Sequence, residues 1–155
     1  MSHEITNKVL KNFKGSATSD QLFDLSKFKG KKIILYFYPK DNTPGCTNES
    51  IEFQSLIDQF NAQNAVIFGI SRDSLKSHEK FKAKYQFAFE LISDEDEHIC
   101  NIFDVIKEKN MYGKKYLGIE RSTFLINENG VLISEWRKVK AKGHAQIVLE
   151  YITHL

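Results

Sequence analysis

Short apolar runs alternate with amphipathic segments along most of the chain. Residues 33–38 and 65–70 are continuous apolar runs, rich in β-branched and aromatic side chains. Such runs are typical of parallel strands that are buried on both faces of a sheet. Between them, apolar residues recur at helical spacing and predict a helix over about residues 47–63. This part of the chain is therefore expected to form a β-α-β unit.

The alternation continues toward the C-terminus. A helix is predicted near residues 74–85, with Asp73 or Ser74 as its cap, and a short strand is predicted over residues 89–92. The acidic run 94–97 is expected in the first turn of a further helix, where carboxylates suit the helix dipole.

The last part of the chain predicts a hairpin and a helix. Residues 122–126 and 131–136 flank an Asn-Glu-Asn-Gly turn, and this antiparallel pair is expected to close the sheet. An amphipathic pattern predicts a helix over about residues 143–155. The expected order is β-α-β-α-β-α-β-β-α, an α/β fold in which residues 1–155 form one domain, with no element assigned before Gly30.

Composition narrows the class of protein. The chain has 155 residues, of which 41% are hydrophobic, so one sizeable core is expected. Its 22 basic and 20 acidic side chains nearly cancel, so no nucleic-acid groove is expected, and the basic stretch 137–142 is interpreted as a solvated loop. No secretory signal is visible and no apolar run approaches the roughly 20 residues that span a bilayer. A cytoplasmic protein with no membrane contact is expected.

Metal and cofactor sites are not indicated. Two cysteines, Cys46 and Cys100, are too few for a disulfide framework or a structural zinc site. The five histidines are scattered without paired spacing, so surface or capping roles are expected for them; they are His3, His78, His98, His144 and His154.

Cys46 is the strongest candidate for chemistry. It follows Pro and Gly at the point where a buried strand gives way to a helix, so its sulfur is expected at a helix N-terminus. An unperturbed thiol, with a pKa of about 8.5, is mostly protonated at neutral pH, and a helix N-terminus favours the reactive thiolate. Taken alone, Cys46 is equally compatible with a small buried hydrophobic side chain.

The residues around Cys46 carry a resemblance. Pro39, Thr43 and Cys46 have the spacing Pro-x-x-x-Thr-x-x-Cys, which resembles the active-site signature of peroxiredoxins; with Glu49, the run is similar to the bacterioferritin-comigratory or PrxQ subfamily. Three further segments also resemble this subfamily: residues 68–71, 91–94 and 121–126. The resemblance implies a thioredoxin-like fold, a mixed sheet flanked by helices, and reduction of hydrogen peroxide and organic hydroperoxides without a cofactor.

Roles follow for the matched residues. Arg121 stands where the family has its essential arginine, and it is expected to stabilise both the Cys46 thiolate and the transition state. Thr43 is expected to hydrogen-bond the peroxide, and Pro39 to shield the pocket from water. Glu49 is expected either to orient Arg121 through an ion pair or to be a first-turn residue favoured by the helix dipole.

Other kinds of thiol chemistry agree with the sequence around Cys46 to different degrees. Thioredoxin-type exchange needs Cys-x-x-Cys, and Thr43 occupies the position three before Cys46. No papain-like or caspase-like signature surrounds the thiol. A non-enzymatic redox sensor or holdase of the thioredoxin fold would use the same thiol and remains the alternative.

The sequence also bears on how oxidised Cys46 is recycled. Ile51 stands where the subfamily often has a resolving cysteine, and residues 73–85 contain none. Cys100 lies among apolar residues, so a buried core thiol is favoured over a resolving one. We therefore expect a one-cysteine cycle, reduced by an external thiol from thioredoxin, glutaredoxin or a small molecule, in a monomeric protein.

Overall fold

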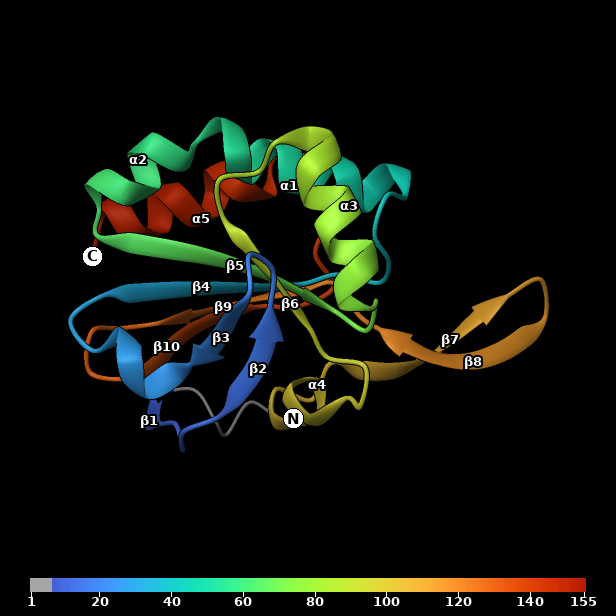
Figure 1. The fold of residues 1–155 in the computed structure, drawn as a ribbon. Coiled ribbons are helices and arrows are strands. Elements are labelled where there is room, and N and C mark those ends of the chain that lie inside the picture. Colours follow the sequence, from blue (N-terminus) through green and yellow to red (C-terminus); the bar gives the residue numbers. More distant parts are fainter. Residues whose placement is uncertain (1–6) are drawn as a thin grey trace.

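An eight-stranded mixed sheet forms the centre of the molecule (Figure 1). The computed structural model describes residues 7–155. The order across the sheet is β1-β10-β9-β4-β5-β6-β2-β3. These strands are β1 (Lys8–Val9), β2 (Lys14–Ala17), β3 (Gln21–Asp24), β4 (Lys32–Phe37), β5 (Ala65–Ser71), β6 (Glu90–Ser93), β9 (Ser122–Ile126) and β10 (Val131–Trp136). Strand β5 runs parallel to β4 and β6, whereas β9 runs antiparallel to β4.

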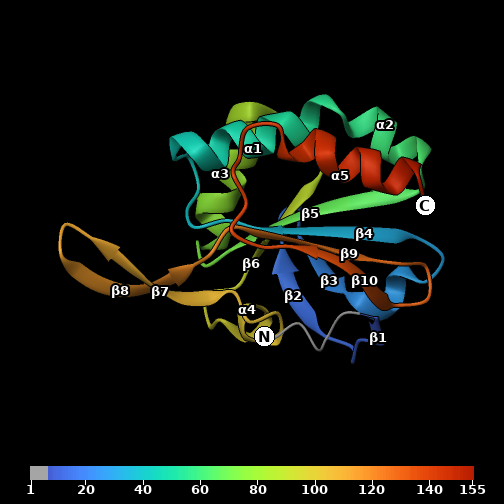
Figure 2. The same cartoon turned by 180° about the vertical axis from the view of Figure 1, so that it is seen from behind.

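Helices cover both faces of this sheet. They are η1 (Leu25–Phe28), α1 (Pro44–Ser55), α2 (Ile57–Ala62), α3 (Leu75–Tyr85), α4 (His98–Ile102) and α5 (His144–Thr153). In both views α1, α2, α3 and α5 lie over one face, and α4 lies on the other (Figures 1 and 2). A separate two-stranded hairpin, β7 (Ile106–Met111) and β8 (Lys114–Ile119), projects from the body.

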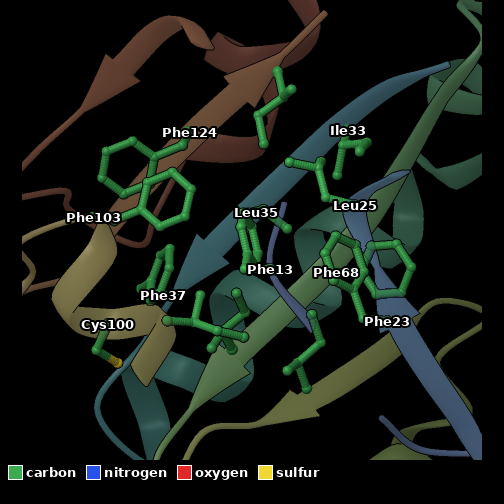
Figure 3. Close-up of a cluster of buried hydrophobic side chains, with 14 of the residues drawn as sticks. Phe13, Phe23, Leu25, Ile33, Leu35, Phe37, Phe68, Cys100, Phe103 and Phe124 are labelled. Atoms are coloured by element: carbon green, nitrogen blue, oxygen red, sulfur yellow. The ribbon is translucent and has the colours of Figure 1, made fainter. Parts of the chain in front are cut away.

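The alternation of side chains along β4 divides the core into two layers, because successive residues of a strand point to opposite faces. The layer on the α4 side includes Leu35 and Phe37, which pack with Phe103 and Phe124 (Figure 3). The layer under the other helices includes Ile34, Tyr36 and Tyr38 from the same strand, with Phe53 and Phe60. One sheet thus serves two apolar clusters.

The mixed sheet flanked by helices confirms the predicted fold class, and the five strands and final helix predicted after Gly30 are present. The predicted helix over residues 47–63 was wrong in detail. It begins at Pro44, whose fixed φ and missing N–H suit the first helical position, and it is interrupted at Leu56. There the Leu56 N–H bonds to the carbonyl groups of Phe53 and Gln54, which ends α1.

The predicted hairpin exists, but it does not close the sheet. Strand β9 lies in the middle, between β10 and β4, and β1 pairs with β10 outside it. Residues 7–30, to which no element was assigned from the sequence, contribute β1 to β3 and η1. These strands are two to four residues long, too short to give a periodic pattern, yet Phe13 and Phe23 between and within them are buried.

The acidic run before α4 was also placed wrongly. Residues 94–97 precede the helix, which starts at His98. The buried Asp94 carboxylate accepts hydrogen bonds from the N–H groups of Ile99 (3.0 Å) and Cys100 (2.7 Å), and so satisfies the start of α4 from outside it. Within residues 7–155, no helix has the length and apolarity that crossing a membrane requires.

Candidate active site

Sheet topology brings the Cys46 turn and Arg121 together. Cys46 follows β4, the strand whose partner β9 starts at Ser122. Because the two strands are antiparallel and Phe37 is paired with Ser122, the end of β4 lies opposite the beginning of β9. Arg121, immediately before β9, therefore lies beside the turn that leads into α1, although 75 residues separate it from Cys46.

Cys46 lies in the first turn of α1 and is only 1% exposed. Thr43 is the N-cap residue, with extended backbone geometry, and Pro44 is the first helical residue. The N–H groups of the first helical turn have no intrahelical carbonyl to bind, so the turn that carries the sulfur has partial positive charge. The predicted position of the thiol at a helix N-terminus is present.

Arg121 bridges the thiol and a buried carboxylate. Its Nη2 lies 3.4 Å from Cys46 Sγ, and its Nη1 donates to Glu49 Oε1 at 2.6 Å. The Arg121 carbonyl accepts the N–H of Val139 at 3.0 Å, which fixes the backbone as well. A permanent cation held at this distance favours an anionic sulfur.

Glu49 is completely buried beneath Arg121. Burial raises the pKa of Glu49 to about 7, although the neighbouring Arg121 cation lowers it. Burial lowers the pKa of Arg121, but the neighbouring Glu49 and Cys46 raise it by more. The pKa of Arg121 is therefore raised overall. Glu49 lies in the second turn of α1, so the alternative of a first-turn residue was wrong, and the predicted ion pair with Arg121 is present.

Thr43 already has a hydrogen-bond partner within the turn. Its hydroxyl donates to the Lys40 carbonyl at 2.8 Å, so its single proton is already used. The oxygen keeps lone pairs and is therefore suited to accept a hydrogen bond from a hydroperoxide rather than to donate one. Pro39 is half-buried in the same turn, directly after buried Tyr38.

A buried polar network anchors this turn, and no sequence pattern indicated it. The Asp41 carboxylate, 7% exposed, accepts from the Tyr38 hydroxyl (2.6 Å) and from Ser77 Oγ (2.8 Å), and its other contact is His78 Nδ1 (2.7 Å). The Asp41 N–H donates to Asp73 at 2.9 Å. The network therefore joins the turn before Cys46 to the start of α3.

Two histidines are not at the surface as predicted. His78 is completely buried, and its Nε2 faces the Ile92 carbonyl at 2.9 Å, so this nitrogen carries a proton. His144 is 3% exposed, and its Nε2 lies 2.7 Å from Thr123 Oγ1. Burial, with a contribution from Arg121, lowers the pKa of His144 to about 4. His98 and His154 are exposed, and His3 lies outside the described residues.

Asp41, Asp73 and His78 each offer an atom within 4.8 Å of the others, close enough for a cation. Both ring nitrogens of His78 and the facing Asp41 oxygen are already engaged with protein groups. The arrangement is that of a hydrogen-bonded anchor for the turn, and a bound metal would have to displace those bonds.

Cys100 lies in the other core layer from Cys46. It is fully buried on α4 among the aromatic side chains of the α4-side cluster, whereas Cys46 belongs to the cluster under α1 (Figure 3). Burial and the neighbouring Asp94 raise the pKa of Cys100 far above that of a free thiol. The preference for a buried core thiol agrees with this position.

A thiol at a helix N-terminus beside a paired arginine, on a thioredoxin-like sheet, is the arrangement of a thiol peroxidase. Residues 6–134 match the model of the AhpC/TSA family. This chain therefore belongs to the AhpC/TSA family.

Individual relatives narrow the assignment. The chain is 58% identical to peroxiredoxin Bcp of Xanthomonas campestris over 120 residues, which cover 77% of this chain and 75% of the relative. It is 52% identical to peroxiredoxin Bcp of Bacillus subtilis over 126 residues, 81% and 80% of the two chains. It is a Bcp/PrxQ-type peroxiredoxin, a thiol-dependent peroxidase.

Solved structures agree. A cysteine-to-serine variant of PrxQ from Xylella fastidiosa superposes with a TM-score of 0.94 at 44% identity, covering 99% of this chain and 98% of that one. Peroxiredoxin Q of Xanthomonas campestris gives a TM-score of 0.88 at 51% identity, covering 92% and 90%. Another Xanthomonas campestris structure, of bacterioferritin comigratory protein, is described in terms of alkyl peroxide reduction and has a TM-score of 0.88 at 50% identity.

Proposed function

We propose that this peroxidase reduces hydrogen peroxide and organic hydroperoxides through Cys46, with Arg121 as the residue that stabilises both the thiolate and the transition state. The observation that carries the proposal is the guanidinium held between Cys46 Sγ at 3.4 Å and Glu49 Oε1 at 2.6 Å. The alkyl peroxide reduction named for the Xanthomonas campestris relative supports the inclusion of organic hydroperoxides.

The reaction transfers one oxygen to sulfur. The Cys46 thiolate attacks one peroxide oxygen, an S–O bond forms as the O–O bond breaks, and the departing oxygen takes up a proton and leaves as water or an alcohol. Cys46 becomes a sulfenic acid. Negative charge moves from sulfur to oxygen during this step, so donors aimed at the oxygens lower the barrier. Arg121 and the Cys46 N–H supply such donors.

The other members of the turn orient the peroxide. Thr43 Oγ1 accepts a hydrogen bond from the hydroperoxide O–H, since its own O–H donates to the Lys40 carbonyl. Pro39, which has no N–H, walls the pocket from water. Glu49 is a positioning residue, because its carboxylate contacts Arg121 and fixes one edge of the guanidinium.

An external thiol reduces the sulfenic acid in a one-cysteine cycle. Two features support this half of the proposal: Cys100 packs in the core layer across the sheet from Cys46, and Ile51 on α1 is a 42% exposed apolar residue rather than a second thiol. The reductant is thioredoxin, glutaredoxin or a small thiol. A monomer in the cytoplasm stays our expectation for the working enzyme, and gel filtration and cell fractionation test it.

Single-turnover kinetics with hydrogen peroxide test the proposal. Cys46→Ser is expected to abolish peroxide consumption while Cys100→Ser retains it. Arg121→Ala is expected to slow the peroxide step on the order of 10²-fold, the usual effect of removing one transition-state donor. Peroxide reduction by folded Cys46→Ser, or an Arg121→Ala variant as fast as wild type, contradicts the assignment.

A further inference from the structure

The β7–β8 hairpin extends away from the rest of the molecule (Figures 1 and 2). Strand β8 ends at Ile119, two residues before Arg121. Four large apolar side chains of the hairpin are exposed: Met111 (55%), Tyr112 (98%), Tyr116 (43%) and Leu117 (65%). A two-stranded ribbon is marginally stable by itself, and exposed apolar side chains grouped in this way are typical of an interaction surface.

The strand register assigns the hairpin residues to two faces, because directly paired residues share a face. One face contains the pair Ile106 and Ile119, which pack against the α4-side core. The opposite face, here called the basic face, consists of Lys107, Lys109, Met111, Lys114, Tyr116 and Gly118. One face thus holds the hairpin to the body, and the other is free of that packing.

Two side chains of the basic face lie over Gly118, near the base of the hairpin. A Cβ placed on Gly118 would lie 3.2 Å from Tyr116 Cε2 and 3.3 Å from Lys109 Cδ, so both side chains lean over Gly118 toward the base of the hairpin. Lys109 is close enough to interact electrostatically with Arg121 and Cys46. Burial and the Arg121 cation lower the pKa of Lys109, with Cys46 opposing them.

The charge of the basic face has one sign. It contains three lysines and no acidic residue. Lys107 is paired with Asp104 at 3.1 Å, whereas Lys109 and Lys114 take part in no ion pair within residues 7–155. Six residues of extended strand cover about 20 Å, which is far larger than a peroxide and matches a protein surface.

We propose that the basic face docks the protein that reduces oxidised Cys46, and that this reductant carries acidic side chains beside its reactive dithiol. The inference rests on the proposed function, which requires a reductant to reach Cys46. Charge complementarity favours an acidic partner. A second copy of this chain would place two basic faces against each other, which like charges oppose.

A partner with two thiols can reduce the Cys46 sulfenic acid in two steps. One thiolate of the partner attacks the Cys46 sulfenic acid, forming a mixed disulfide and releasing hydroxide, which a proton converts to water. The partner's second thiolate then attacks the partner's first sulfur, the one that is bonded to Cys46 in the mixed disulfide. Cys46 leaves as a thiolate, and the partner departs oxidised.

The experiment compares turnover with a protein dithiol and with dithiothreitol. Lys109→Glu/Lys114→Glu is assayed with reduced thioredoxin and reduced glutaredoxin in place of the unidentified partner. The matched control is Lys27→Glu/Lys29→Glu, which changes net charge equally on exposed residues in and after η1, at the other end of the sheet. The ratio of kcat/KM for the protein dithiol to the rate with dithiothreitol is expected to fall about 10-fold in the hairpin variant and to stay unchanged in the control.

Two further measurements separate docking of the reductant from a direct effect of the substitutions on Cys46. Lys109 lies near Cys46, whereas Lys114 lies at the tip of the hairpin. Lys114→Glu is therefore also assayed alone, and it is expected to lower the same ratio. For wild type, 1 M salt is expected to lower it too, since charges are then screened beyond about 3 Å.

Several results would overturn the proposal. They are an unchanged ratio in the hairpin variant, an equal loss with both kinds of reductant, an equal loss in the control, or a wild-type enzyme that dithiothreitol recycles and neither protein dithiol does. A loss confined to an anionic hydroperoxide substrate would assign the basic face to substrate instead. Failure of the proposed function is distinguishable, because the peroxide step would then be absent in single turnover without any reductant.

Discussion

Gly45 lies between the first helical residue and the reactive thiol, and the guanidinium occupies the space its side chain would need. A Cβ at Gly45 would lie 3.1 Å from Arg121 Nη2, closer than side chains normally approach. The position of Arg121 is thus set from two sides, by the bond to Glu49 and by the absence of a side chain at Gly45.

Gly45→Ala is expected to slow the peroxide step on the order of 10-fold while the fold is retained. The added methyl group displaces the end of a flexible side chain by a few tenths of an ångström, and small misplacements at a reacting centre are costly. The rate constant for hydrogen peroxide and the urea midpoint measure the two effects. A wild-type rate, or a large loss of stability, would show that the contact does not position Arg121.

Glu49→Gln tests the buried carboxylate through pH. The folded-state pKa of about 7 lies above the ordinary value of 4.5, so ionising Glu49 costs more in the folded state. Its contribution to stability is fully present below about pH 4.5 and is lost as pH rises through about 7. The free energy of unfolding of wild type, measured with urea, is therefore expected to fall between pH 5 and pH 8 relative to that of the variant. Parallel pH profiles for the two proteins would contradict this.

At the scale of secondary-structure elements, the turn before α1 is held to α3 by buried hydrogen bonds. Asp41 connects it to α3 through Ser77 and His78, and both the carboxylate and the imidazole are buried. Buried polar groups that are fully bonded hold a unique arrangement, and removing one partner leaves others unsatisfied.

Asp41→Asn is expected to destabilise the protein by about 1–3 kcal/mol, since an amide cannot accept all three contacts of the carboxylate. Urea unfolding measures the change, with exposed Asp20→Asn as the control. The peroxide step is expected to slow as well, because the same turn carries Thr43 and Cys46. An Asp41→Asn variant as stable as the control would contradict the anchoring role.

Strand prediction succeeded most clearly where burial is continuous and failed where the strands are very short or largely exposed. Strands β4 and β5 are almost wholly buried, so their apolar runs are visible in the sequence. Strands β7 and β8 are largely exposed on both faces, so no period of two marks them. The Asp41–His78 contact was invisible for another reason: 37 residues separate the two, and only the tertiary fold brings them together.

At the scale of the whole molecule, family resemblance supplied what periodicity could not. The pairing of Arg121 with Cys46 depends on antiparallel register between β4 and β9, which no local pattern encodes. The order of the strands across the sheet was likewise not predicted correctly, because β1 and β2 join it through long-range pairings of only two residues with β10 and β6.

Trapping the oxidised enzyme tests the separation of the thiols by the sheet. After one equivalent of hydrogen peroxide without reductant, mass spectrometry is expected to find one added oxygen on Cys46 and a free Cys100. Cys100→Ser should give the same product on Cys46. A Cys46–Cys100 disulfide in wild type would contradict the one-cysteine cycle.

The placement of Cys100 on the far side of the sheet from Cys46 also has a kinetic consequence. In enzymes with a nearby second thiol, disulfide formation removes the sulfenic acid before more peroxide arrives. In the one-cysteine cycle proposed above, the sulfenic acid persists until a reductant collides with it, and further peroxide converts it to the irreversible sulfinic acid. If that proposal holds, survival of the enzyme in a peroxide burst depends on the concentration of its reductant.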